Sequence, residues 1–414
     1  MVTSRRADVK VMTRCAIMPT ELSMREPIHP SRVLLLSAVG TGINPYIGLL
    51  RDGLAAAGAE VRLSSILDPA EAVAFRPDVI HLHWLERYDL PPAIAATGLR
   101  GATGLPQRAA RRVIETAANA PPVCMLRRGG RLRRLFSQLR TFQAGGGRVA
   151  YTVHNLDPHE EAGLVDHWGA ARLLRLADIV HVHDASTAEA LAARFGRRQG
   201  VVVIPHGHYL EAYPNTVSRT EARARLDLPL DTFVFICLGL LRPYKGLEDL
   251  LPAFRSLPDA GIRLVLAGKP GSEEYLRSLQ ALADGDERVR IMPRFVPPDE
   301  VQVYLDAADV AVLPYRQITT SGAALLAFSL GLPVIAPALG AFPNLLAESR
   351  RGILYDPAEP DALAHALAQA RRTDWTGARQ EIMAWVAQFD WGEIGRKLVA
   401  AYRAGPVECG AWNP

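Results

Sequence analysis

The sequence contains no apolar run long enough to cross a membrane. A spanning helix needs about 18 or more consecutive apolar residues, and no segment of this 414-residue chain reaches that length. Residues 1–30 carry basic side chains but lack the continuous apolar core of a secretory signal, so they are expected to form a disordered extension. These absences predict a cytoplasmic protein.

Cysteine is scarce, and the few cysteines are scattered. Their spacing matches neither a metal site nor a redox pair, since they are Cys15, Cys124, Cys237 and Cys409. Such usage is typical of a reducing compartment. The length exceeds one comfortable hydrophobic core and predicts two domains, while 49% hydrophobic and 22% charged residues are typical of a globular protein.

Acidic side chains are nearly absent between Arg100 and Arg148, where eleven arginines accompany a single acid, Glu115. Within this stretch, the segment Arg127–Arg140 combines arginines with an apolar stripe at helical spacing. The stripe consists of Leu132, Leu135, Phe136 and Leu139.

This basic segment has three interpretations. It is a solvated face over an ordinary core stripe, a surface helix in peripheral contact with anionic lipid at the inner membrane face, or a nucleic-acid site. Nucleic acid is disfavoured because no recognition motif accompanies the arginines. We expect the stripe to pack on the first domain rather than to enter lipid.

Short apolar runs alternate with helical patterns in both halves of the chain, which predicts α/β domains with parallel sheets. In the first half the predicted strands are 33–38, 60–64, 78–83, 148–154, 178–183 and 201–205. In the second half they are 233–239, 263–267, 289–292, 310–313 and 333–336. The polar segment 205–231 is interpreted as a linker. The predicted domains are 31–214 and 215–389, followed by a helix in 390–414.

The segment from Leu238 to Gly246 is the most informative part of the sequence. It joins a predicted strand to a predicted helix over 247–257, and it contains Gly239, Arg242 and Lys245. A turn of this kind leaves backbone N–H groups free, the helix N-terminus carries partial positive charge, and the two cations add full charges. The segment therefore predicts a binding site for a diphosphate.

Two further segments lie at the ends of predicted strands, the edge at which α/β sheets bind ligands. His154 ends the predicted strand 148–154 and would face a cleft there. Thr320, Ser321 and Gly322 begin a predicted helix, whose free amides suit phosphate or sugar hydroxyls.

A glycine turn with Gly40, Gly42 and Asn44 follows the first predicted strand. It is not the dinucleotide fingerprint, because Pro45 stands where a third glycine is required. A tight turn that leads into a helix N-terminus still permits close approach of an anion.

Three motifs resemble those of the retaining nucleotide-sugar glycosyltransferases of the GT-B fold, specifically family GT4. They are Leu-Arg-Pro-Tyr-Lys-Gly at 241–246, Leu-Pro-Tyr-Arg at 313–316 with Ser-Gly at 321–322, and Gly-Leu-Pro-Val-Ile-Ala at 331–336. The resemblance runs from about residue 32 to the C-terminal helix and is strongest between 232 and 337. It implies two Rossmann-like doubly wound domains that face a central cleft, with the nucleotide sugar in the second domain and the acceptor in the first.

The resemblance also implies roles for individual residues. Arg242 and Lys245 would stabilise the leaving diphosphate, and His154 would orient the reacting sugar. The other implied donor contacts are Gly40, Gly42, Asn44, Gly239, Tyr315, Thr320, Ser321 and Gly322. The departing phosphate would take the proton from an acceptor hydroxyl on a glycolipid, a polysaccharide or a secondary metabolite.

Two features depart from the family pattern. Many GT4 proteins carry two glutamates eight positions apart around the helix after the Ser-Gly pair, where this chain has Ile318 and Leu326. The usual cation directly after the glycine is replaced by Leu240. The missing glutamate pair motivates an alternative hypothesis, in which the chain is a catalytically weak sugar-nucleotide-binding subunit that acts with a partner. The presence of Arg242, Lys245 and His154 argues against this alternative.

No metal or other cofactor is expected. Period-two spacing puts pairs of imidazoles on one strand face, but no carboxylate or cysteine completes a ligand set, so hydrogen bonding at the cleft edge is expected. The pairs are His81/His83, His181/His183 and His206/His208. Asp284 and Asp286 imitate a metal-binding Asp-x-Asp motif, but they are expected to lie in a solvated loop between a helix and a strand.

Overall fold

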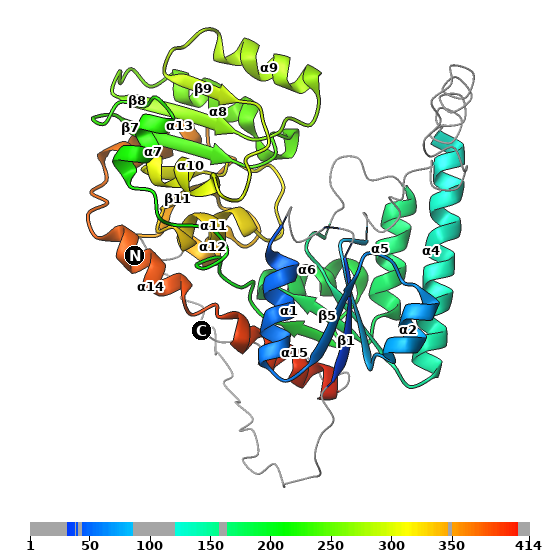
Figure 1. Cartoon of the computed structure of the whole chain (residues 1–414). Coiled ribbons are helices and arrows are strands. Elements are labelled where there is room, and N and C mark those ends of the chain that lie inside the picture. Colours follow the sequence, from blue (N-terminus) through cyan, green and yellow to red (C-terminus); the bar gives the residue numbers. More distant parts are fainter. Residues whose placement is uncertain are drawn as a thin grey trace, which may run out of the picture. The chain divides into compact units, whose positions relative to one another are not determined.

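The computed structural model describes residues 31–37, 39, 44–85, 121–156, 164–346 and 350–404 of the chain, with the backbone alone for 121–124. Figure 1 follows the chain through these residues. The predicted extension, residues 1–30, lies outside them.

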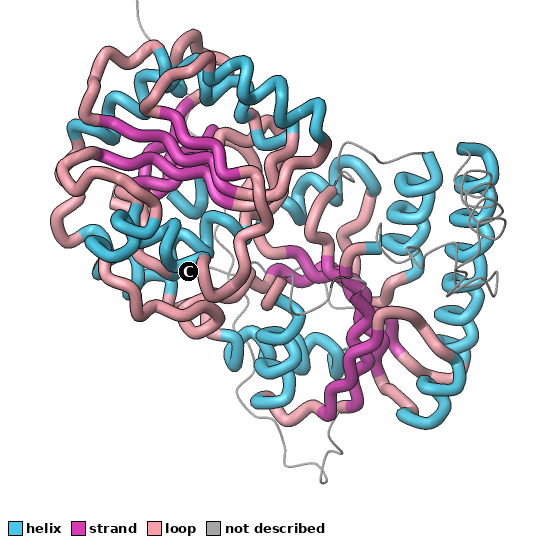
Figure 2. The backbone as a smooth tube through the Cα atoms, turned by 45° about the horizontal axis from the view of Figure 1, so that its top comes forward, coloured by secondary structure: helices cyan, strands magenta, loops and turns pink. Residues whose placement is uncertain are grey.

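The first half of the chain forms a six-stranded parallel sheet in the order β2-β1-β3-β4-β5-β6. The strands are β1 (Arg32–Ser37), β2 (Glu60–Ser64), β3 (Val79–His83), β4 (Arg148–Thr152), β5 (Ile179–Val182) and β6 (Val201–Val203). The helices between them are α1 (Tyr46–Ala56), α2 (Pro69–Phe75), α4 (Pro121–Ala144), α5 (Leu164–Leu176) and α6 (Ala185–Phe195). One core, with α1, lies on one face of the sheet, and a second core, with α2, α4 and α5, lies on the other. Figure 2 shows helices on both faces of the strands.

The second half forms another six-stranded parallel sheet, in the order β12-β11-β10-β7-β8-β9. Its strands are β7 (Phe233–Leu238), β8 (Ile262–Ala267), β9 (Val289–Met292), β10 (Val310–Val312), β11 (Val334–Pro337) and β12 (Gly352–Tyr355). Its helices are α7 (Arg219–Arg225), η3 (Pro243–Lys245), α8 (Leu247–Arg255), α9 (Glu273–Ala283), α10 (Val301–Ala307), α11 (Gly322–Ser329), α12 (Phe342–Leu346), α13 (Ala362–Arg372) and α14 (Ala378–Val386). Again a separate core covers each face of the sheet.

Local chemistry explains where these elements begin and end. The Asp184 carboxylate accepts a hydrogen bond from the Thr187 amide (2.8 Å) and caps the start of α6, while Gly196 ends the helix in a left-handed conformation with φ 65°. Strands such as β1 are buried on both faces, as parallel strands covered by helices must be.

The last helix, α15 (Trp391–Ala404), packs against α1 of the first half. Two glycines permit the close approach. A Cβ at Gly53 would lie 2.2 Å from the Trp391 carbonyl oxygen, and one at Gly395 would lie 2.0 Å from the Gly53 carbonyl oxygen. Either side chain would therefore force the two helices apart.

The predicted strands are all present, most with ends within two residues of the prediction. The strand β12 was not predicted, and neither were several helices, among them α2 and α7. The segment 205–231, interpreted as a linker, contains α7. Its Arg223 is fully buried, and Nη1 donates to the carbonyl oxygens of Pro229, Leu230 and Thr232. This segment is therefore partly helical and packed. The exact domain limits stay a prediction.

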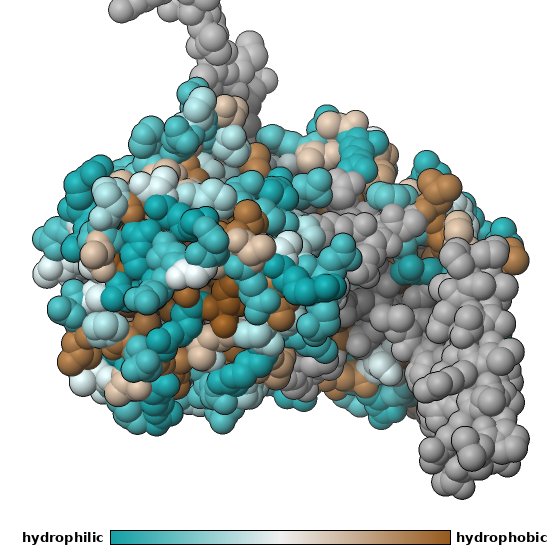
Figure 3. Space-filling model, turned by 90° about the horizontal axis from the view of Figure 1, so that it is seen from above, coloured by the Kyte–Doolittle hydropathy of each residue, from teal (hydrophilic) through white to brown (hydrophobic). Residues whose placement is uncertain are grey.

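The apolar stripe of the basic segment packs inward, as expected. Leu132, Leu135, Phe136 and Leu139 of α4 are each at most 4% exposed and belong to the core with α2 and α5. In the described part of the chain, no helix has the length and apolar character needed to span a bilayer. The face seen in Figure 3 is largely hydrophilic, with scattered apolar side chains.

Candidate active site

Lys245 lies directly over the glycine turn that follows β7. Gly239 has φ 114°, and a Cβ there would lie 2.9 Å from the Lys245 ammonium nitrogen. That nitrogen is 3.5 Å from the Leu238 carbonyl oxygen and 5.6 Å from the centre of the Tyr315 ring, and the residue is only 4% exposed. The structure thus brings together three predicted site residues around one buried positive charge.

A second glycine holds this turn against the next loop of the sheet. Gly268 follows β8 with φ 152°, and a Cβ there would lie 1.8 Å from the Gly239 carbonyl oxygen. The Leu241 amide also donates to the Lys269 carbonyl oxygen (3.0 Å). A side chain at position 268 would therefore push the two loops apart.

Arg242 extends from the same turn toward the loop after β8. A Cβ at Gly271 would lie 2.8 Å from its Cδ and 3.1 Å from its Nε. The turn that precedes α8 therefore carries two cations, one buried and one half-buried. The predicted site for a diphosphate has the expected strand, turn and helix around it.

Acidic residues begin α8, but a nearby arginine pairs with them. Arg316 makes a two-point ion pair with Asp249, with N–O distances of 2.7 and 2.9 Å, and its Nη1 lies 3.7 Å from Glu248. These hydrogen bonds and charges raise the pKa of Arg316 further above its ordinary value. The pairing reduces the negative charge that would otherwise face a phosphate.

The start of α11 touches the chain just after β4. Thr320 Oγ1 donates to the His154 carbonyl oxygen (3.2 Å), and the Leu156 amide donates to Thr319 Oγ1 (3.1 Å). Ser321 caps α11, because its Oγ accepts a hydrogen bond from the Ala324 amide (3.1 Å). The carboxyl edges of the two sheets therefore meet at His154 and Thr320.

His154 is enclosed by aromatic side chains. Its ring stacks on Trp84 with centroids 4.1 Å apart and planes 10° apart, and Nε2 is 3.1 Å from Nδ1 of His83. The Tyr46 ring packs edge-on at 4.9 Å. Trp84 has φ 48°, a left-handed conformation that bulky side chains rarely adopt, so the fold holds this indole against His154 at an energetic cost.

Two of the paired histidines, His81 and His181, join a buried hydrogen-bonded row, whereas His183 and His206 line a cavity beside the start of α11. The row runs from the Tyr402 hydroxyl to His81 (2.7 Å), to Thr152 Oγ1 (2.7 Å), to His181 (3.0 Å) and on to the Ile204 carbonyl oxygen (2.8 Å). The expected hydrogen bonding is confirmed, but for His81 and His181 it lies inside the fold and not at the edge of a cleft. The exception to this burial is His208, which is half-exposed and belongs to the last pair.

Burial keeps these imidazoles neutral. Desolvation is the main cause, and nearby histidines add to it, so the pKa of His154 and of His83 falls well below the ordinary value of 6.5. Desolvation also lowers the pKa of His181 and His206 to about 4. Near pH 7, His154 would therefore meet a ligand as a neutral hydrogen-bonding group.

Other predicted residues have less direct outcomes. Gly40 and Gly42 lie outside the described residues, and Asn44 Oδ1 accepts a hydrogen bond from the Tyr46 amide (3.0 Å) at the start of α1. A Cβ at Gly322 would lie 3.4 Å from the Tyr209 hydroxyl. The roles of all predicted site residues stay predictions.

The two positions that lack glutamate are partly buried among apolar side chains. Ile318 and Leu326 pack against the core that contains α11. Asp284 and Asp286 lie in the expected loop after α9, where they pair with Arg255 and Arg288 respectively. Within the described ranges, no group of three or more histidine, cysteine or acidic side chains could hold a metal ion.

Sequence reasoning missed the residues that surround His154. Trp84 and Tyr46 carry no motif. Trp391 packs on Tyr46, and Tyr402 reaches His81 from 321 positions away. The repeated His-x-His spacing was the one available signal, since it places successive imidazoles on one face of β3 and of β5.

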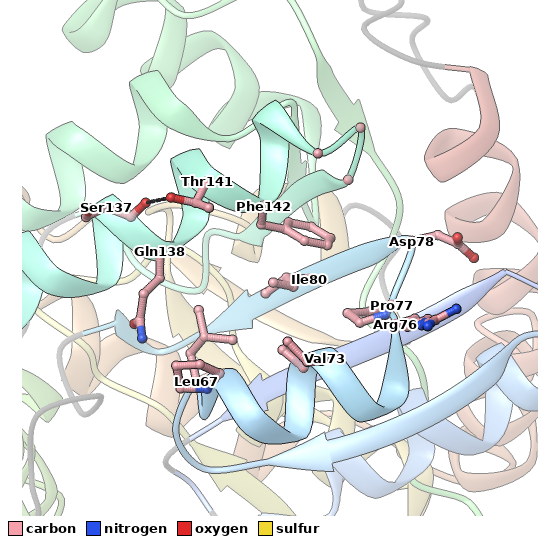
Figure 4. A pocket seen from close by; sticks show the side chains of 15 residues that line it. Leu67, Val73, Arg76, Pro77, Asp78, Ile80, Ser137, Gln138, Thr141 and Phe142 are labelled. Atoms are coloured by element: carbon pink, nitrogen blue, oxygen red, sulfur yellow. Dashed lines mark hydrogen bonds between the residues drawn. The ribbon is translucent and has the colours of Figure 1, made fainter.

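Two cavities lie at opposite edges of the first sheet. One, of about 540 Å³, is lined from both halves by His183, His206, Ser321 and Arg351, beside the start of α11. The other, also about 540 Å³, lies between α2 and α4 (Figure 4), with Leu67, Val73, Ile80 and Phe142 in its wall. Because Asp78 and Gly147 also line it, it opens at the amino ends of β3 and β4, away from His154.

Comparisons with known proteins bear on the family and the fold. Residues 232–373 match the family of glycosyl transferases group 1. The GDP-mannose:glycolipid 4-beta-D-mannosyltransferase of Xanthomonas campestris pv. campestris is 28% identical over 361 residues, which are 87% of this chain and 88% of that protein.

Solved structures show the fold. Sucrose-phosphate synthase from Thermosynechococcus elongatus has a TM-score of 0.65 and 20% identity, over 90% of this chain and 98% of its own. Anabaena HepE, in complex with UDP and glucose, has a TM-score of 0.63 and 16% identity, over 91% and 100%. With its two parallel sheets and its matching second half, this chain is a glycosyltransferase with the GT-B fold that carries a glycosyl transferases group 1 domain.

Proposed function

We propose that this protein transfers a sugar from a nucleoside diphosphate sugar to a hydroxyl group of a glycolipid. The observation that carries the proposal is the buried ammonium of Lys245 above Gly239, in a turn that also carries Arg242 and leads into α8. Preorganised positive charge in a site of low dielectric constant stabilises the charge that develops on a leaving diphosphate.

The donor and acceptor classes are supported by relatives. The Xanthomonas relative is named for GDP-mannose and a glycolipid, and it aligns with 87% of this chain. The HepE structure contains UDP and glucose. A neutral His154 at the junction of the two halves is suitably placed in this proposal to hydrogen-bond the sugar hydroxyls.

The proposed stereochemical course is retention, with attack on the face from which the diphosphate departs. In this course the departing phosphate oxygen takes the proton of the acceptor hydroxyl, so no separate base is required. The name of the Xanthomonas relative specifies a beta linkage, which makes the product configuration the decisive measurement.

Purified protein is incubated with GDP-mannose or UDP-glucose and a detergent-dispersed glycolipid, with and without EDTA. We expect a glycosylated lipid whose anomeric carbon, assigned by NMR, has the configuration of the donor, and we expect turnover to be unchanged by EDTA. An inverted product would overturn retention. Loss of turnover in EDTA that Mn²⁺ or Mg²⁺ restores would overturn metal independence, and binding without turnover for every donor would favour the non-catalytic subunit.

A further inference from the structure

The helices α4 and α5 present charge of only one sign to solvent. α4 contains six arginines and no acid. The single acid of α5, Asp166, is 6% exposed and pairs with Arg128. The other five arginines of α4 are exposed: Arg127, Arg131, Arg133, Arg134 and Arg140. The outer surface of this helix pair is therefore cationic.

The same two helices also expose large apolar side chains near their first turns. Leu126 is 78% exposed, Leu164 is 80% exposed, and Met125 and Trp168 are each more than 40% exposed. These are four of the nine large hydrophobic side chains that are exposed in the described part of the chain. Figure 3 shows apolar side chains at the surface on the side of the molecule where α4 lies.

An ion pair and a ring contact show that these side chains form one surface. The Arg128–Asp166 pair sets the turn with Met125 and Leu126 beside the turn with Leu164. Further along, the rings of Trp168 and Phe136 are 5.6 Å apart. We call this surface the α4–α5 tip, defined by Met125, Leu126, Arg127, Arg131, Leu164 and Trp168.

The α4–α5 tip lies at the active-site edge of the first sheet. α5 is the helix that follows β4, so its N-terminus lies toward the end of the strand at which His154 is found. α4 precedes β4 and runs beside α5 (Figure 1), with its own N-terminus at the same edge. A partner that binds the α4–α5 tip would therefore lie near the place where donor and acceptor meet in the proposed function.

We propose that the α4–α5 tip binds the surface of an anionic phospholipid bilayer, with Leu126, Leu164 and Trp168 among the headgroups and the arginines over lipid phosphates. Exposed leucines are unsuited to a nucleic-acid backbone, whereas basic residues beside Trp and Leu are typical of helices that lie in the membrane interface. The inference rests on the proposed function in one respect, because a glycolipid acceptor is reached at such a surface.

The test measures co-sedimentation of the full chain with vesicles of phosphatidylcholine alone or mixed equally with phosphatidylglycerol, at low and high NaCl. The unmodified protein is expected to bind only the anionic vesicles and to be released by salt, since the screening length shrinks to about 3 Å at 1 M. Changing Arg127, Arg131 and Arg134 together to Gln should lower partitioning by roughly a hundredfold, because each cation near an anionic surface contributes roughly fivefold.

A second variant, Leu126→Asn with Leu164→Asn, should lower partitioning to the anionic vesicles by at least about tenfold, since apolar insertion adds to the charge attraction. Matched controls are Leu230→Asn, at a leucine 63% exposed in the second half, and Arg277→Gln, at an exposed arginine of α9. Melting temperatures of all variants check that they fold.

Absence of binding to anionic vesicles at low salt would overturn the proposal, as would unchanged binding in both tip variants. Binding to RNA but not to vesicles would replace the bilayer by nucleic acid. Donor hydrolysis in detergent provides a separate readout: the tip variants should keep it, and its absence in the unmodified protein would count against the proposed function and not against the membrane surface.

Discussion

Lys245 combines burial with a position above a glycine turn, and few lysines are found in such a place without a partner for their charge. The charge faces the Leu238 carbonyl oxygen and the Tyr315 ring, which are neutral groups. Burial of an ammonium next to neutral groups is costly unless an anion offsets it. In the proposed function, a diphosphate in the turn supplies that anion.

Lys245→Ala and Arg242→Ala are each expected to lower turnover by roughly 10²–10³-fold, because each removes one group that stabilises the leaving charge. Both should also weaken binding of GDP or UDP, measured by calorimetric titration. Lys269→Ala is the matched control, since Lys269 is an exposed cation in the neighbouring loop. Unchanged nucleotide affinity in both site variants, with normal melting curves, would contradict the assignment of the turn.

Trp84 is strained, and its strain can be measured directly. A left-handed backbone conformation, such as φ 48° at Trp84, costs a residue with a side chain roughly 1–2 kcal/mol. Glycine has no Cβ and adopts the same conformation without this cost. We therefore expect Trp84→Gly to be more stable than Trp84→Ala by about 1 kcal/mol in urea unfolding, the reverse of the usual order. Both variants should lose turnover, because both remove the ring that stacks on His154. Equal or greater stability of the alanine variant would show that position 84 is unstrained.

At the scale of elements, hydrophobic runs and turn chemistry predicted every strand of the two sheets except β12, because parallel strands covered by helices are almost wholly apolar. The same reasoning failed for α7, because its sequence is polar and does not show that Arg223 is buried. The burial depends on carbonyl groups that only the folded chain brings together around the guanidinium. This reasoning also failed for the surroundings of His154. Trp84 and Tyr46 reach that site through backbone geometry and packing, neither of which leaves a motif in the sequence.

The loops after β7 and β8 act as one element, because Gly268 lets them touch through their backbones. Gly268→Ala places a Cβ 1.8 Å from the Gly239 carbonyl oxygen, so we expect a loss of at least about 2 kcal/mol in the free energy of unfolding together with weaker nucleotide binding. Gly130→Ala in α4 is the control. No atom lies within 4 Å of a Cβ there, and alanine should be neutral or stabilising in a helix. Similar behaviour of the two variants would contradict the close packing of the loops.

At the scale of the whole molecule, the two halves and the last helix share a single buried polar cluster. His81 bonds to Tyr402 of α15, His206 approaches Tyr209 next to α11, and the segment after His154 bonds to Thr319. The hydrogen-bonded row therefore ties the C-terminal helix to the first sheet, and the contacts at Thr319 and Thr320 tie that sheet to the second half. A change that disrupts the cluster should therefore lower the stability of the whole molecule and not of one domain alone.

Low pH should destabilise this buried polar cluster, because its histidines are neutral in the folded protein. The pKa of His181 and His206 is about 4 in the folded protein and about 6.5 in the unfolded chain, so between these values the unfolded chain binds more protons. Stability is therefore complete above pH 6.5 and falls as the pH decreases, by about 1 kcal/mol per pH unit for each such group. Burial also lowers the pKa of His83 and His154 well below 6.5, so these two groups add to the loss of stability as the pH decreases.

Urea unfolding between pH 7.5 and pH 5 isolates this effect, because most carboxyl groups titrate near pH 4 in unfolded chains. We expect the free energy of unfolding to decrease steeply as the pH falls below 6.5. The slope against pH should correspond to several more protons bound by the unfolded chain than by the folded one. His181→Gln removes one buried titrating group, so it should reduce the number of protons that the slope represents by about one. This reduction is expected even if the substitution also changes the stability at pH 7.5. The exposed His365→Asn variant should keep the original slope. A flat profile from pH 7.5 to pH 5 in the unmodified protein would mean that the histidines are already solvated or charged in the folded state, and the neutral His154 of the proposed mechanism would have to be abandoned with it.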